Sequence, residues 1–124
     1  MKRLSLIIIL LFQIAVSTAV GQDQKVYRSA EQMPQFPGGE AALMKYISSH
    51  TQTPQIEEHI EGRVVVQFVV NTDGSIGDVK VVRSVHPDYD KEAIRVIKSL
   101  PKFTPGRQNG QAVAVWYTLT VIFR

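Results

Sequence analysis

The fold is decided by the stretch RVVVQFVV at residues 63–70 and by the sequence NTDGS that follows it at residues 71–75. Large apolar residues recur at every second position of the first stretch, as in a β-strand with one face in a core: Val64, Val66, Phe68 and Val70. Asp73-Gly74 is a preferred dipeptide of tight hairpin turns. A second β-rich run follows at residues 76–85. The sequence therefore predicts an antiparallel hairpin over residues 63–85.

The C-terminal stretch shows the same alternation. Apolar side chains stand at the odd positions of residues 113–123, namely Val113, Val115, Tyr117, Leu119, Val121 and Phe123. This period of two predicts a third strand. Residues 102–111, which precede it, read as a loop.

Two segments have helical spacing instead. The first covers residues 40–50 after Gly38-Gly39, and the second covers residues 89–100 between a predicted cap at Asp88 and a stop at Pro101. Apolar residues recur in them every three or four positions: Leu43, Met44 and Ile47 in the first, and Tyr89, Ala93, Val96 or Ile97, and Leu100 in the second.

The predicted order is helix, strand, strand, helix, strand, which is an α+β arrangement. A hairpin joins the first two strands and a helix crosses from the second to the third, so the first strand fits between the other two. We therefore expect a three-stranded antiparallel sheet in the order 2-1-3, with both helices on one face and the third strand as an exposed edge. One core is predicted to contain Phe68, Val79, Val96, Leu119 and Val121.

The N-terminal residues have the features of a targeting segment. Lys2 and Arg3 precede an apolar stretch at residues 4–20, which small residues close. This order predicts a cleaved signal peptide at residues 1–21, and a retained membrane anchor is the alternative. Residues 22–37 are then an extended lead-in and residues 38–124 a single domain. The formal net charge of +3 falls to about +1 without Lys2 and Arg3, so it does not indicate a nucleic-acid partner.

Residues for enzymatic chemistry do not form a recognisable set. The chain has no Cys, which excludes thiolate nucleophiles and Cys-ligated metals. His50 and His59 lack the H-E-x-x-H spacing of a zinc site, and His86 before Pro87 reads as a turn residue. No G-x-S-x-G motif or Walker lysine is present. We expect no enzyme activity, no cofactor and no metal.

Five stretches resemble the C-terminal domain family of TonB, in its Bacteroidetes-type version. They are MPQFPGGEAAL at residues 33–43, IEGRVVVQF at 60–68, DGSI at 73–76, Ala93-Ile94, and FTPG at 103–106. The similarity covers residues 33–124. It implies the family's α+β fold, without an enzymatic step. It also implies the family's partners, which are the inner-membrane ExbB and ExbD proteins and the TonB box of outer-membrane receptors.

The resemblance also implies where a partner binds. In this family the TonB box adds as a strand to a sheet edge, which here implies the binding residues Val113, Ala114, Val115, Trp116, Tyr117, Thr118, Leu119 and Thr120. The family's Tyr-Pro corresponds to Thr53-Pro54, which we add to the site.

The outer sheet face is expected to be covered by the lead-in through Met33 and Phe36, or by a second copy.

Three functions remain open at this point. A lead-in of residues 22–35 spans at most roughly 50 Å when fully extended, so an anchored domain would not cross the periplasm. We therefore favour a free periplasmic module that binds TonB boxes. An energy transducer anchored in the inner membrane and facing the periplasm is the second interpretation. A structural module that forms a homodimer through the edge strand is the third.

Overall fold

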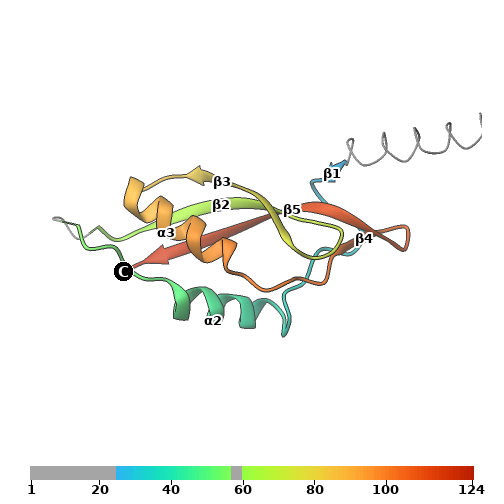
Figure 1. The fold of residues 1–124 in the computed structure, drawn as a ribbon, viewed down its shortest axis with the longest axis horizontal. Coiled ribbons are helices and arrows are strands. Elements are labelled where there is room, and N and C mark those ends of the chain that lie inside the picture. Colours follow the sequence, from blue (N-terminus) through green and yellow to red (C-terminus); the bar gives the residue numbers. More distant parts are fainter. Residues whose placement is uncertain (1–24, 57–59) are drawn as a thin grey trace, which may run out of the picture.

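The computed structural model describes residues 25–56 and 60–124, so the predicted signal peptide and His59 lie outside the described residues. It has an α+β fold (Figure 1). In chain order the elements are β1 (Val26–Tyr27), α2 (Glu40–His50), β2 (Gly62–Val70), β3 (Ile76–Arg83), α3 (Pro87–Lys98), β4 (Gly106–Gln108) and β5 (Gln111–Phe123).

The three long strands form the body of the sheet. β2 lies between β3 and β5 and is antiparallel to both, with Val64 opposite Val121 and Phe68 opposite Tyr117. The α+β class with two helices is thus confirmed. The prediction of a three-stranded, wholly antiparallel sheet is wrong, because β1 pairs in parallel with β5 and β4 pairs with it as well.

The two additional strands lie where no strand was predicted. β1 falls in the lead-in of residues 22–37, and β4 falls in the predicted loop of residues 102–111. They have two and three residues, which is too short for a period of two to be visible in the sequence. The lead-in also makes isolated bridges from Gln32 to Arg107 and from Gln35 to Thr104.

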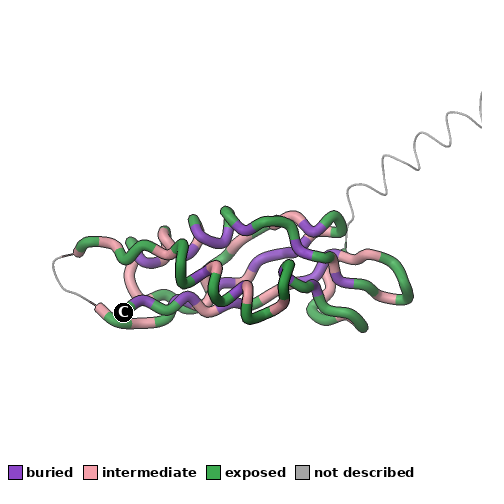
Figure 2. Tube along the Cα trace, turned by 90° about the horizontal axis from the view of Figure 1, so that it is seen from below, coloured by how far each residue is buried: buried purple, intermediate pink, exposed green. Residues whose placement is uncertain are grey.

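The core lies between the sheet and the two helices. Figure 2 shows buried residues along the strands and at intervals along the helices. Phe68, Val96, Leu119 and Val121 belong to one buried cluster as predicted, and Val79 is half-buried against it. Their common burial confirms which face of each long strand points inward.

Phe36 is part of this core, so its predicted place on the outer sheet face is wrong. Its ring centroid lies 5.4 Å from that of Phe103 and 5.9 Å from that of Tyr46. Met33 does lie with Trp116 around a shallow pocket on the sheet. Val82 remains 55% exposed on β3. Val69 on the same face, opposite Trp116, is only 5% exposed. The lead-in therefore contributes an aromatic side chain to the core and lies beside Trp116 on the outer face through Met33.

The start of α3 differs from the prediction in its cap. His86, not Asp88, is the N-cap residue, and its Nδ1 accepts a hydrogen bond from the backbone N–H of Asp88 at 3.1 Å. Pro87 fixes φ at the first helical position and favours an extended residue before it. The strand-breaking His86-Pro87 pair thus also begins the helix.

Candidate functional site

The first residues of β5 are already paired, which corrects the prediction of a wholly exposed third strand. Val113 pairs with Gly106 of β4, and Ala114 and Val115 pair with Val26 and Tyr27 of β1. Ala114 and Val115 are 1% and 0% exposed. This part of the predicted binding site is therefore occupied by the chain itself.

The open part of the edge begins at Trp116. Beyond Val115, no strand of the described residues pairs with β5 on the side opposite β2. Of the predicted residues, Thr118 is exposed, Trp116, Tyr117 and Thr120 are half-exposed, and Leu119 is buried. A row of backbone N–H and C=O groups along residues 116–123 is thus available on this side for pairing with another strand.

A groove lies beside the last residues of this open edge. Figure 1 shows α2 running alongside β5, on the side away from β3. The groove has a volume of about 350 Å³ and is lined by α2, by the segment that follows it and by the end of β5: Met44, Ile47, Ser48, Thr51, Thr53, Thr120, Ile122 and Arg124. It brings the predicted residues Thr53 and Thr120 together. Pro54 lies instead in a separate pocket against α3, with Asp88 and Lys91.

The groove combines apolar surface with a few polar groups. Met44 and Ile122 are 40% and 41% exposed there. Ser48 and the threonines contribute hydroxyls, and Arg124 is the single charged residue of the lining. Within the described residues, no group of three or more His, Asp or Glu side chains could hold a metal ion. The arrangement suits an extended chain that pairs with β5 and rests side chains against α2.

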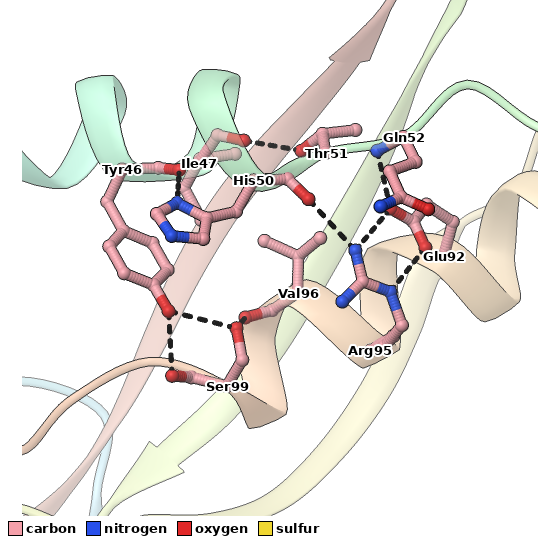
Figure 3. Close-up of polar contacts among 9 residues, drawn as sticks. All are labelled: Tyr46, Ile47, His50, Thr51, Gln52, Glu92, Arg95, Val96 and Ser99. Carbon is pink, nitrogen blue, oxygen red and sulfur yellow. Dashed lines mark hydrogen bonds and ion pairs between the residues drawn. The ribbon is translucent and has the colours of Figure 1, made fainter.

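A polar network attaches α2 to α3 and so fixes the outer wall of the groove (Figure 3). The hydroxyl of Tyr46 donates to the carbonyl of Ser99 at 2.9 Å. The ring of His50 stacks on that of Tyr46 at a centroid distance of 3.8 Å. The guanidinium of Arg95 donates to the carbonyl of His50 at 2.9 Å. The last two turns of α2 are therefore held in one position beside β5.

Glu92 is the centre of this network. Its carboxylate accepts two hydrogen bonds from Arg95, at 2.6 and 2.7 Å, and one from the backbone N–H of Gln52 at 2.6 Å. The Arg95 guanidinium, with the Gln52 N–H, holds the pKa of the Glu92 carboxyl below its ordinary value of about 4.5. The ionised carboxylate is thus the form that joins α3 to the segment after α2.

Glu92→Gln is expected to make stability less dependent on pH in the acid range. Because the pKa of Glu92 is lowered by folding, its stabilising effect is present above the ordinary value and is lost as the pH falls through the lowered pKa. The free energy of unfolding, measured in urea from pH 7 to pH 3, should therefore differ between wild type and variant at neutral pH and converge in acid. Asp78→Asn, at an exposed site on β3, is the control. A constant difference at all pH values would contradict this role.

Sequence reasoning missed the groove and the network. Met44 belongs to the apolar spacing that predicts the first helix, but the structure places it in the groove wall. The Arg95 contact is made to a backbone carbonyl 45 residues away, which leaves no residue-type signature. One available sign was the Arg95 and Glu92 pair at a spacing of three on a predicted helix. That spacing does not reveal the further bonds to α2.

Part of the chain is similar to known proteins. Residues 55–124 match the family described as Gram-negative bacterial TonB protein C-terminal. Protein TonB of Helicobacter pylori, in strains J99 and 26695, is 40% identical over 62 residues, which is 48% of this chain. The match covers 22% of the length of those relatives. The family match includes β2 to β5 and α3, and the chain belongs to the TonB C-terminal domain family.

Proposed function

We propose that this domain binds the TonB box of outer-membrane receptors by strand addition and serves TonB-dependent transport across the outer membrane. The observation that carries the proposal is the open β5 edge at residues 116–123, whose last residues line the groove beside α2. The peptide's backbone would pair with β5. Its alternate side chains would face Met44 and the groove.

The composition of the edge supports this function. Residues 116–123 read WYTLTVIF and contain no Pro and no Lys, which commonly block edge strands against pairing. Pairing through backbone groups tolerates many peptide sequences, while side-chain contacts select among them. The proposed binding residues are Trp116, Tyr117, Thr118, Leu119 and Thr120 from the prediction, with Thr53 from the groove.

The proposed location is the periplasm, where TonB-box peptides of receptors are accessible. In the part of the chain that the structure describes, no helix has the length and apolar character to cross a membrane. A second candidate function is energy transduction with ExbB and ExbD, which the family match supports. A homodimer through β5 is the third candidate, because the same open edge would accept another copy.

Titration with synthetic TonB-box peptides from the same organism's receptors tests the proposal. Backbone amide NMR shifts should concentrate on residues 116–123 and on the end of α2. Met44→Glu should weaken binding about tenfold, because it places a carboxylate against an apolar side chain of the peptide. Lys45→Gln is the matched control, since it changes the net charge equally at the neighbouring exposed position.

The outcomes separate the candidate functions. Shifts confined to α3 or to the turn at Asp73-Gly74 would refute strand addition. Shifts on β5 that appear with protein concentration alone, together with a doubled mass by light scattering, would favour the homodimer. Equal losses of peptide affinity for Met44→Glu and Lys45→Gln would show that the groove is not part of the binding site. The β5 edge would then remain as the proposed site.

A further inference from the structure

The lead-in occupies part of the same edge that we propose for the peptide. β1 pairs with Ala114 and Val115 on the side of β5 opposite β2, and the open edge begins at the next residue, Trp116. One side of a strand accepts only one partner at each position. A peptide that continues its pairing from Trp116 back to Val115 and Ala114 must therefore replace Val26 and Tyr27.

We propose that β1 is a displaceable strand that limits the length of β5 open to a partner and is released when a longer peptide pairs along the edge. This inference rests on the proposed function of the edge. It assigns a regulatory role to the lead-in, since the length of the bound peptide determines whether β1 stays in the sheet.

The lead-in has a second attachment that does not lie on this edge, which we call the strap (residues 31–36). Gln32 and Arg107 exchange backbone hydrogen bonds of 3.0 and 2.8 Å, and Gln35 and Thr104 exchange bonds of 3.0 and 2.8 Å. Phe36 anchors the strap in the core with 8% exposure. The strap therefore stays in place when β1 leaves.

β1 is held much more weakly than the strap. It pairs over two residues, and both of its side chains are only half-buried. Each backbone hydrogen bond has a modest net value in water, and parallel pairing is slightly less stable per residue than antiparallel pairing. Residues 28–30 belong to no strand and connect β1 to the strap. This segment gives β1 freedom to detach without unfolding the domain.

The overlap with the proposed site continues past β1. Arg28, just after β1, and Met33 of the strap lie around one shallow pocket with Trp116, Tyr117 and Thr118. These three residues are the first of the open edge. Detachment of β1 would therefore clear Ala114 and Val115 and also move Arg28 away from the start of the proposed peptide site.

A disulfide between β1 and β5 tests the inference, because the chain contains no Cys of its own. Val26 and Ala114 are register partners, and Cα atoms on neighbouring strands lie about 4.8 Å apart, within disulfide range. The peptide that binds best in the titration is used in a short form and in forms lengthened by three residues at either end. Calorimetry compares the oxidised and reduced states of Val26→Cys/Ala114→Cys.

Oxidation should weaken the binding of one lengthened peptide about tenfold and leave the affinity of the short peptide unchanged. Only the lengthened peptide pairs with residues 114 and 115, which the disulfide keeps occupied by β1. Val26→Pro, which disfavours a paired strand at this position, should tighten binding of the same lengthened peptide about threefold. Ser29→Pro, outside the paired residues, is the matched control and should change neither. Equal affinities of the lengthened peptides in both redox states would overturn the displaceable strand.

Hydrogen exchange without any peptide keeps the two proposals apart. The amides of the β1–β5 pairing should exchange much faster than those of Gln32 and Gln35, whose bonds belong to the strap. If no peptide binds in either redox state, the proposed function fails. The hydrogen exchange of the β1 amides then decides by itself whether β1 detaches. Exchange as slow in β1 as in the strap would then show that β1 is a fixed strand.

Discussion

Phe68→Ala is expected to lower the free energy of unfolding by about 3 to 5 kcal/mol. The Phe68 side chain is 0% exposed and lies in the C-terminal half of β2. Its ring packs at centroid distances of 5.9 Å from Phe103 and 5.5 Å from Tyr117. Removal of the ring leaves a cavity beside two aromatic partners that a β-sheet backbone cannot fill by small shifts. Urea unfolding followed by circular dichroism measures the loss.

Val82→Ala is the control for this experiment. Val82 also lies in a long strand, but it is 55% exposed on the outer face. Its truncation should change stability by less than about 0.5 kcal/mol. A loss below about 1 kcal/mol for Phe68→Ala would show that the ring does not hold the sheet to the helices.

The long elements could be predicted because their patterns are local and repeated. Val64, Val66 and Phe68 face one core in alternation, so β2 was visible from its sequence alone. The same holds for β5, whose alternation continues to Phe123. These patterns also fixed the position of β2 between its neighbours, since a hairpin and a crossover helix leave few arrangements.

The short elements could not be predicted because tertiary contacts create them. β1 exists because Val26 and Tyr27 meet the backbone of β5, and nothing in their own sequence alternates. Phe36 lies in a polar, proline-containing segment, yet Phe103 and Tyr46 bury it. As a result the sequence predicted an edge that was open over its whole length. The structure leaves residues 116–123 without a described strand partner on that side.

The candidate site was predicted only through the family resemblance and only in part. Thr118 and Thr120 lie on the open part of the edge, whereas Val113 to Val115 are paired. The groove depends on the placement of α2, which Arg95 fixes through the carbonyl of His50. A contact between a side chain and a distant backbone carbonyl leaves no periodic pattern in sequence. The resemblance could therefore indicate the strand but not its open length.

Gly74→Ala is expected to destabilise the domain by at least about 3 kcal/mol. A loss of this size is typical of substitutions that create a steric clash or backbone strain. Gly74 has a φ of 86° in the β2–β3 turn, a region that L-residues rarely adopt. Its carbonyl accepts a hydrogen bond from the Phe103 N–H at 2.8 Å. An added Cβ would overlap the carbonyl oxygen of Phe103, which is backbone and cannot rotate away.

Gly110→Ala separates the two causes of this loss. Gly110 has a φ of 77°, but a Cβ there would meet no atom within 4 Å. It should therefore cost only the conformational strain, roughly 1 to 2 kcal/mol. Thermal and urea unfolding of both variants give the difference, which measures the contact between the turn and the segment that leads into β4. Equal losses would mean that Phe103 moves aside freely, and the turn would then not be fixed against that segment.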